Sequence, residues 1–284
     1  MFLFDTHAHY NLSPLYENWQ EHWIKAQENG VTKSIVVGAG MESSKRAVEI
    51  ASQAKGLYAS IGKHPDVYRQ AVKIKLQNHE DWQSVFTDIQ EDIKSFRKII
   101  LEEIIVAIGE VGLDYYRMPE KGDKRKWMIE AQKKAFEAQI NLALEFDLPI
   151  IVHIRDRKDK ADAHWEALEI LGEFKNKEKN LKFVLHCVSG PLDYLQKGLE
   201  LGAYIGVDGN VTYEGVDKLI DLIKIVPENK LLLETDAPYL APEPYRGEIC
   251  QPWMLRLVAE FLEKELNISK RQFYTNANAF FKLS

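Results

Sequence analysis

The chain alternates between amphipathic segments and short apolar runs, and this alternation limits the folds that it can adopt. Apolar residues with helical spacing over 15–29 and 43–55 stop at Gly30 and Gly56, the residue type favoured just past a helix. A short apolar run follows each stop, and the same order recurs to the end of the chain. The pattern predicts eight strands that alternate with helices.

The predicted strands are short and nearly all apolar, which is typical of a parallel sheet covered on both faces. We expect them within 2–9, 33–38, 57–61, 104–108, 149–152, 182–185, 203–206 and 231–234. Helices are expected over 15–29, 43–55, 126–147, 161–174, 192–201, 216–225, 253–266 and 270–282, with one or two more within 68–103. Eight such units predict a (β/α)8 TIM barrel formed by one domain, residues 1–284. A doubly wound open sheet is the rival fold, but the chain has no Gly-x-Gly-x-x-Gly turn.

Composition excludes several classes of protein. The formal net charge is −6, whereas a protein that coats DNA phosphates non-specifically is usually basic. The two cysteines, Cys187 and Cys250, do not make a disulfide framework. There is no signal-peptide pattern and no apolar run approaching the roughly 20 residues of a membrane span. We therefore expect a cytoplasmic protein with no membrane contact and no obligate protein partner.

An Asp-x-His-x-His cluster ends the first predicted strand. Side chains two apart on a strand point to the same side, so Asp5, His7 and His9 are expected to share one face. Two imidazoles held in this way can bind one divalent metal ion. The cluster alone is weak evidence, because imidazoles also occur in cores and on surfaces.

Matching polar groups follow later strands, and these strengthen the metal hypothesis. In a barrel, groups at the carboxyl ends of the strands converge on one mouth. The candidates at these ends are His64, Glu110, His153, His186 and Asp236. Five of the eight histidines thus lie at strand ends. The other three, His22, His79 and His164, are expected to be solvated surface residues.

Imidazole and carboxylate ligands suit zinc, manganese, iron or cobalt better than an all-oxygen magnesium cage. Six candidate ligands exceed one tetrahedral catalytic site and suit two ions about 3.5–4 Å apart that share a carboxylate and a water. We assign His7, His9 and Asp236 to one ion and His153 and His186 to the other, with Glu110 as the bridge. Asp236 could also accept a proton from the shared water. We therefore expect two divalent metal ions, with zinc, manganese and magnesium left open.

Six motifs, in order across nearly the whole chain, resemble the TatD family of metal-dependent deoxyribonucleases. They are Asp5–His9, Gly62–Pro65, Gly109–Arg117, Ile151–Arg155, Leu185–Gly190 and Leu232–Pro242. The resemblance implies a TIM-barrel hydrolase of the amidohydrolase-like group, with a two-metal centre bridged by Glu110. It also implies cleavage of DNA phosphodiester bonds, often exonucleolytic, with single strands or 3′ ends as the substrate.

Two departures from the family pattern fall outside the candidate ligands. After Tyr245-Arg246-Gly247 the family usually carries a basic residue and then Arg-Asn-Glu-Pro, whereas this chain has Glu248-Ile-Cys-Gln-Pro252. The family also often has a second His after His-Pro, where this chain has Asp66. Both changes bear on the identity of the substrate more than on the chemistry.

Three further residues, His64, Arg155 and Arg246, are expected to contact the substrate. His64 could instead be a secondary metal ligand or a turn residue. Arg155 could hold a phosphate through two parallel hydrogen bonds or pair with a neighbouring acid such as Asp156. Arg246 has the same two alternatives: a phosphate or a neighbouring acid.

Other residues near these motifs have roles that the sequence leaves open. Asp114 could orient a ligand imidazole or cap a turn. Cys187 is expected to be buried and not a ligand, and the charged run 156–162 is expected to be a solvated loop.

Three functions compete at this stage. The leading hypothesis is a metal-dependent DNA phosphodiesterase, and the second is a small-molecule hydrolase of the amidohydrolase or phosphoesterase type on the same site. The commonest binuclear amidohydrolases bridge their metals with a modified lysine on strand four, where this chain has Glu110. The third, a non-catalytic binding role, is disfavoured because a charged cluster is costly to keep in an apolar barrel without metal.

Overall fold

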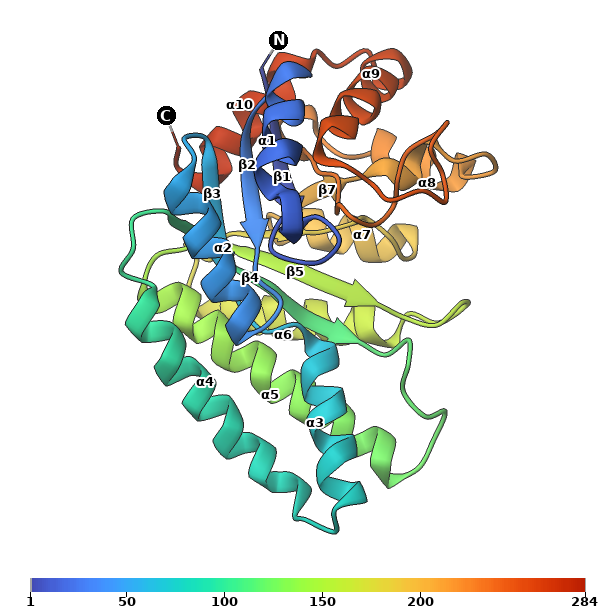
Figure 1. Ribbon diagram of the computed structural model, residues 1–284. Coiled ribbons are helices and arrows are strands. Elements are labelled where there is room, and N and C mark those ends of the chain that lie inside the picture. The colour runs from blue at the N-terminus through green and yellow to red at the C-terminus, as the bar shows by residue number, and fades with distance from the viewer. Residues whose placement is uncertain (1, 284) are drawn as a thin grey trace.

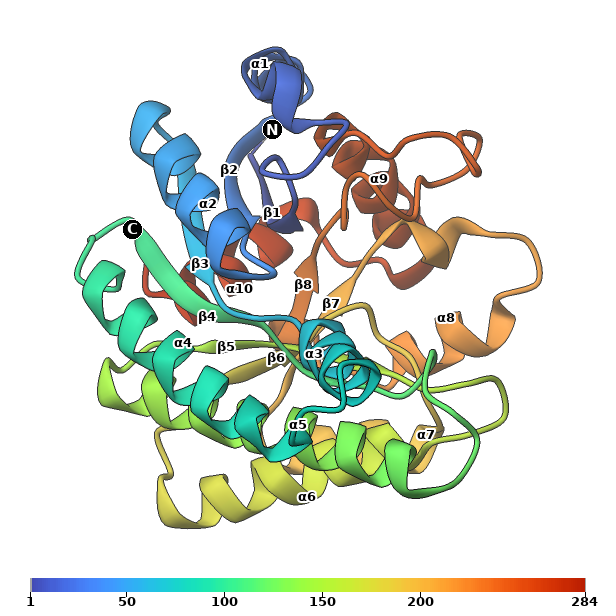
Figure 2. The ribbon, with the colours of Figure 1, turned by 60° about the horizontal axis from the view of Figure 1, so that its bottom comes forward.

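Eight parallel strands form one sheet whose spatial order follows the sequence from β1 to β8. The computed structural model describes residues 2–283. The strands are β1 Leu3–Ala8, β2 Val31–Val37, β3 Leu57–Ile61, β4 Ile105–Asp114, β5 Ile150–Arg155, β6 Phe183–Leu185, β7 Tyr204–Val207 and β8 Leu231–Leu233. Figures 1 and 2 show these strands at the centre of a ring of helices.

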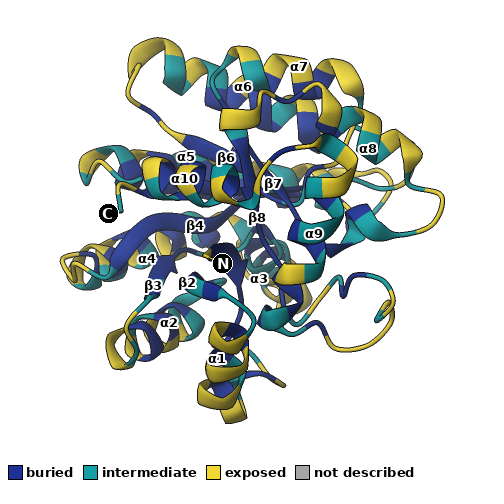
Figure 3. Ribbon diagram, turned by 90° about the horizontal axis from the view of Figure 1, so that it is seen from above, coloured by how far each residue is buried: buried dark blue, intermediate teal, exposed yellow. Residues whose placement is uncertain are grey.

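The helices lie outside the sheet, and Figure 3 shows their exposed faces turned away from the buried strands. They are α1 Trp19–Glu28, α2 Met41–Gln53, α3 Pro65–Gln77, α4 Val85–Ile99, α5 Asp123–Glu145, α6 Asp162–Lys177, α7 Leu192–Glu200, α8 Asp217–Lys224, α9 Leu255–Leu266 and α10 Lys270–Phe281. Short 3₁₀ turns occur at Tyr16–Asn18, Trp82–Ser84, Gly209–Thr212, Glu228–Lys230 and Pro252–Met254. Within residues 2–283, no helix combines the length and the apolar character needed to cross a bilayer.

The edges of β1 and β8 meet, so the sheet nearly closes on itself. Ala8 and Ala237 form an isolated parallel bridge, and the backbone N–H of Asp236 donates to the carbonyl of His7 at 2.9 Å. The hydroxyl of Thr6 also donates to the carbonyl of Leu233 at 2.9 Å. The predicted (β/α)8 barrel is therefore confirmed, and the open doubly wound sheet is excluded.

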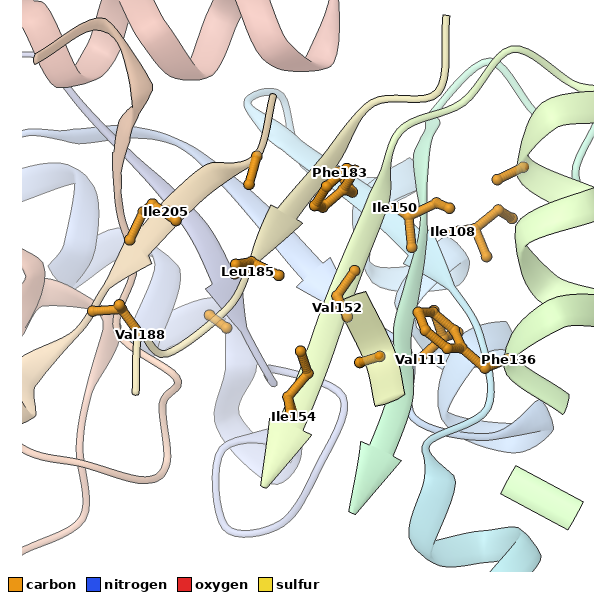
Figure 4. Close-up of a cluster of buried hydrophobic side chains, with 14 of the residues drawn as sticks. Ile108, Val111, Phe136, Ile150, Val152, Ile154, Phe183, Leu185, Val188 and Ile205 are labelled. Atoms are coloured by element: carbon orange, nitrogen blue, oxygen red, sulfur yellow. The ribbon is translucent and has the colours of Figure 1, made fainter. Parts of the chain in front are cut away.

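Apolar side chains fill both sides of the strand layer. Inside the barrel, Phe4, Ile151 and Leu232 belong to one cluster that includes Phe280 and Phe281 of α10. Between the sheet and the outer helices lies a larger core, and Figure 4 shows Phe136 of α5 beside Val111 of β4 in it. Helix α10 packs on β1 and β8, and the ring centre of Phe281 lies 5.9 Å from that of Phe4 near the start of β1. The candidate ligands lie toward the opposite, carboxyl ends of the strands.

Strands β4 and β5 run further than the sequence pattern predicts. β4 continues from the expected stop at 108 to Asp114, and β5 continues to Arg155. Glu110 and His153 therefore lie within strands rather than after them. The pattern missed this extension because every residue of β4 is buried, including polar ones that look like the end of an apolar run.

Glycines allow β4 to approach its neighbours closely on either side of Glu110. A Cβ at Gly109 would lie 2.6 Å from the Cβ of Ile151. Gly112 has a φ of +145°, and a Cβ there would overlap the carbonyl oxygen of His153. The register between β4 and β5 shifts across this stretch, between Ile108 and Val111. The backbone geometry that presents Glu110 thus depends on residues without side chains.

Gly112→Ala should lower the free energy of unfolding by about 3 kcal/mol, because it adds backbone strain to a clash with a fixed carbonyl. The matched control is Gly122→Ala, where φ is +97° but, apart from its chain neighbours, no atom of residues 2–283 lies within 4 Å of the added Cβ. The free energy of unfolding of that control should fall by only about 1 kcal/mol. Urea denaturation of the two variants measures the difference, and equal losses would contradict the close approach of β4 and β5.

Candidate metal centre

His7 and His9 emerge from β1 on the same side, as expected. Their Nε2 atoms lie 3.2 Å apart. Asp236, which follows β8, places its Oδ1 atom 3.6 Å from His7 Nε2 and 3.4 Å from His9 Nε2. One ligand atom from each residue thus lies within 4.8 Å of the others, so this group could hold a metal ion.

The orientation of His9 is set by a backbone carbonyl. Its Nδ1 atom lies 3.0 Å from the oxygen of Val37, which also accepts a hydrogen bond from the Asn11 amide at 2.9 Å. A carbonyl only accepts, so Nδ1 carries the proton and Nε2 presents its lone pair to the site. Such a contact is the usual support of a metal-binding imidazole.

Glu110 lies between two sets of imidazoles. Its Oε2 atom is 3.7 Å from His7 Nε2 and 3.8 Å from His9 Nε2. Its Oε1 atom is 2.7 Å from His153 Nδ1 and 3.8 Å from His186 Nε2. The two carboxylate oxygens therefore face different groups of candidate ligands.

Charge around Glu110 keeps this carboxyl ionised in a buried position. Burial alone would raise its pKa, but the imidazoles of His153 and His64 hold the pKa of Glu110 well below its usual value. Its backbone N–H donates to the carbonyl of Gly38 at 2.8 Å, which fixes the main chain at this point.

His186 is supported by a carboxylate that the sequence analysis did not assign. Oε1 of buried Glu234 lies 2.8 Å from His186 Nδ1 and accepts the backbone N–H of Cys187 at 2.6 Å. Although burial opposes it, the charge of Glu234 raises the pKa of His186 well above its usual value. The available signal was the position of Glu234 at the end of the last apolar run, where the sequence places the other candidate ligands of later strands.

A third group gathers behind His153. Asp114 Oδ2 lies 3.5 Å from His153 Nε2, and Asp114 Oδ1 accepts the backbone N–H of Tyr116 at 2.8 Å. Asp114 thus contacts a candidate ligand and caps a turn, which were the two alternatives. His64 Nε2 lies 3.9 Å from Glu110 Oε1, while His64 Nδ1 accepts the backbone N–H of Asp66 at 3.1 Å. Burial and the proximity of His153 lower the pKa of His64 to about 4.

The donor set fits a divalent cation. His7, His9, Glu110 and His186 are all buried, and His7 Nδ1 and His153 Nε2 are buried nitrogen atoms without a hydrogen bond within residues 2–283. A water-poor cluster of imidazole and carboxylate groups is costly unless cations or protons balance it. Nitrogen and oxygen donors of this kind suit zinc, manganese, iron or cobalt.

Arg155 and Arg246 lie against tyrosine rings. The guanidinium carbon of Arg155 is 4.1 Å from the ring centre of Tyr116, and that of Arg246 is 4.2 Å from the ring centre of Tyr213. In the described part of the chain, neither guanidinium forms an ion pair within 4.0 Å of a carboxylate. The alternative pairing of Arg155 with Asp156 is therefore wrong.

His164 was expected on the surface, and that prediction is wrong. It is buried in the first turn of α6, and its Nδ1 atom lies 2.7 Å from Asp156 Oδ2. The run 156–162 is therefore not solvated at its first residue. The charged residues before His164 suggested a position in solvent, but one of them, Asp156, is its buried hydrogen-bond partner. His79 is exposed as expected, and His22 is half-buried.

Cys187 also differs from its predicted environment. It is half-buried rather than buried. It belongs to none of the candidate metal-binding groups found among the described residues.

A barrel with buried histidines and carboxylates at the carboxyl ends of its strands defines a metal-dependent hydrolase of the amidohydrolase-like kind. A family model described as TatD related DNase matches residues 4–282. The chain belongs to this TatD family, whose members include enzymes that hydrolyse ester bonds.

Relatives across the full length agree with this assignment. An uncharacterized metal-dependent hydrolase of Bacillus subtilis, YabD, is 31% identical over 279 residues, which cover 98% of this chain and 97% of the relative. The 3′-5′ ssDNA/RNA exonuclease TatD of Musicola paradisiaca is 32% identical over 270 residues, 91% of this chain and 90% of the relative. The crystal structure of YjjV, a TatD homolog from Escherichia coli, has a TM-score of 0.80 at 26% identity, with 99% and 98% of the two chains covered.

Glu234→Gln should weaken metal binding about 10- to 100-fold, because the carboxylate beside His186 would lose its charge. Competition with a coloured chelator measures the affinity. Glu200→Gln, on the exposed end of α7, is the control and should bind metal as the parent protein does. An unchanged affinity for Glu234→Gln would mean that this carboxylate does not support the imidazole.

Proposed function

We propose that this enzyme cleaves phosphodiester bonds of DNA, exonucleolytically and on single strands or 3′ ends, with two divalent metal ions. The observation that carries the proposal is the position of Glu110, whose two oxygens face His7 and His9 on one side and His153 and His186 on the other. A carboxylate in this position suits a bridge between two ions. The relative from Musicola paradisiaca, named as a 3′-5′ exonuclease, supports the choice of substrate.

In this proposal the candidate ligands divide between the two ions. His7, His9 and Asp236 would hold the first ion, His153 and His186 would hold the second, and Glu110 would be the shared ligand. Bound divalent ions would acidify a water between them and offset the charge of the phosphoryl oxygens. Zinc and manganese suit the nitrogen-rich set better than magnesium.

Asp236 is proposed to take up the proton of the attacking water. The side chain of Asp236 is 14% exposed and that of Glu110 is 6% exposed, so Asp236 is the closer of the two carboxylates to solvent. Oδ1 faces His7 and His9, and the second oxygen remains for a water or for the reacting group. A positioned carboxylate of this kind is a suitable proton acceptor.

Arg155, Arg246 and His64 are proposed to bind the substrate phosphates. The two guanidinium groups stack on tyrosine rings, which orients them without neutralising their charge. Each can therefore offer two parallel hydrogen bonds to a phosphate. His64 Nδ1 accepts the backbone N–H of Asp66, so Nε2 of the neutral ring carries the hydrogen and could donate it to a phosphoryl oxygen. The net charge of −6 implies that DNA is held at this local site rather than along the surface.

One observation favours a second candidate, a small-molecule phosphoester or amide as the substrate. Glu248 is exposed close in sequence to Arg246, where it adds a negative charge to the loop expected to contact DNA. A panel of single-stranded DNA, double-stranded DNA, bis(p-nitrophenyl) phosphate and simple lactones separates the two. The proposal fails if metal-loaded protein leaves single-stranded DNA and the phosphodiester reporter intact.

Glu110→Gln should reduce nuclease activity by more than about 100-fold. Mutating a residue that only supports a metal ligand costs up to about 100-fold in activity, and a shared ligand should cost more. The metal content should also fall from two ions per chain, because the shared carboxylate is lost. Elemental analysis and a fluorescent single-stranded DNA assay measure the two effects. Glu103→Gln, at an exposed position before β4, is the control and should change neither. Full metal content in Glu110→Gln would contradict the bridging role.

Arg155→Met should raise KM for single-stranded DNA about tenfold and leave metal content unchanged, because one phosphate contact worth roughly 1.5 kcal/mol is removed. The salt dependence of KM should become shallower by about one unit of slope. Arg256→Met, whose side chain pairs with Glu260 on α9, is the matched control. If both variants behave alike, Arg155 does not contact the substrate.

A further inference from the structure

A serine, a histidine and an aspartate lie in line outside the candidate metal centre. His164 Nδ1 is 2.7 Å from Asp156 Oδ2, and His164 Nε2 is 3.2 Å from Ser189 Oγ. Asp156 follows β5, His164 stands in the first turn of α6, and Ser189 stands in the loop after β6. The fold thus brings three segments together beside the mouth of the barrel. Nothing in the proposed metal chemistry uses these side chains.

Burial differs along this line in the way that a nucleophile and its base require. The side chains of Asp156 and His164 are 3% and 5% exposed, whereas Ser189 is exposed. The ring of Tyr194 packs edge-on against His164, with ring centres 4.8 Å apart. A Cβ at Gly190 would lie 2.6 Å from His164 Cδ2, so only a glycine fits beside the imidazole. The base and its carboxylate are therefore shielded while the hydroxyl remains accessible.

The hydrogen bonds define which nitrogen of His164 carries the proton. Asp156 Oδ2 accepts from the backbone N–H of His164 at 3.2 Å and faces Nδ1 of the same residue. A carboxylate accepts only, so Nδ1 is the donor and Nε2 offers a lone pair to the hydroxyl of Ser189. This arrangement matches the roles of nucleophile, general base and orienting carboxylate, which are recognised by geometry and not by chain order.

Donors for a developing negative charge are also present. Among residues 2–283, the backbone N–H groups of Ser189 and Gly190 donate to no protein acceptor. The N–H of the residue after a nucleophilic serine is a common donor to the oxyanion of an acyl-transfer reaction. Gly190 has a φ of +89°, a conformation that favours glycine at this point of the loop.

We propose that Ser189, with His164 and Asp156, forms a second reactive centre that attacks carboxylic esters and related acyl or phosphonyl electrophiles. In the first step a bond forms between Ser189 Oγ and the carbonyl carbon, and the hydroxyl proton moves to His164 Nε2. The bond from that carbon to the alcohol oxygen then breaks, and the alcohol leaves with the proton from Nε2. Water then attacks the same carbon and gives a proton to His164 Nε2. The bond from the carbon to Ser189 Oγ breaks, the acid leaves, and Oγ takes the proton back from Nε2.

An alkyl fluorophosphonate tests this centre on the metal-loaded enzyme. A bond forms between phosphorus and Ser189 Oγ, fluoride leaves, and the proton passes to His164. Intact mass should show one adduct per chain, and peptide mapping should place it on Ser189. Ser189→Ala should abolish the adduct, and His164→Gln and Asp156→Asn should each slow labelling at least about 100-fold.

Ser52→Ala is the matched control, because Ser52 is an exposed serine whose hydroxyl donates to the carbonyl of Glu49 and has no imidazole beside it. It should label at the parent rate. Labelling should also persist after metal removal with a chelator, since no candidate metal ligand takes part. Thermal melting of each variant distinguishes lost reactivity from lost fold, and Ser189→Ala at its exposed site should melt at the parent temperature.

The absence of an adduct, or an adduct on another residue, would overturn the proposal. So would a labelling rate that His164→Gln and Asp156→Asn leave unchanged while both remain folded, or labelling that stops when metal is removed. In those cases the three residues serve to fasten the loop after β5 to the loop after β6. Loss of nuclease activity with intact labelling would bear on the metal centre alone.

Discussion

The placement of one carboxylate, that of Glu110, governs the geometry of the candidate metal centre. Its two oxygens lie between imidazoles from β1 on one side and the imidazoles of His153, within β5, and His186, directly after β6, on the other. The main chain can present it there because Gly109 and Gly112 let β4 approach β5 closely. A side chain at either glycine would move the carboxylate, and the imidazole groups would then lose the residue that connects them.

The fold separates packing from chemistry along the barrel axis. Phe280 and Phe281 of α10 close the end where the strands begin, and apolar side chains fill the interior above them. The carboxyl end carries acids and imidazoles in close pairs, such as Glu234 with His186 and Glu110 with His153. These pairs limit the cost of burying charge before any ion is present. Rigid strands beneath them hold the donors in a fixed arrangement.

Much of the architecture was predictable from periodicity, and the rest depends on partners distant in the sequence. Alternating helical and apolar segments predicted the barrel, and the strand-end rule predicted that His7, Glu110 and Asp236 would meet. The full length of β4 was missed because its polar residues are buried by neighbouring strands. His164 was misplaced because its partners, Asp156 and Ser189, come together only in the folded chain. Local sequence patterns indicate which apolar residues can be buried. Which polar residues are buried depends on tertiary contacts.

The seam between β1 and β8 has a consequence for the newly made chain. The candidate ligands His7 and His9 lie in β1 or directly after it, whereas Asp236 follows β8, the last strand to be synthesised. The full ligand set therefore cannot assemble on the ribosome until the last strand has been released and docked against the first. Metal capture by this set would thus follow ring closure, and a product truncated before β8 would lack one of the candidate ligands.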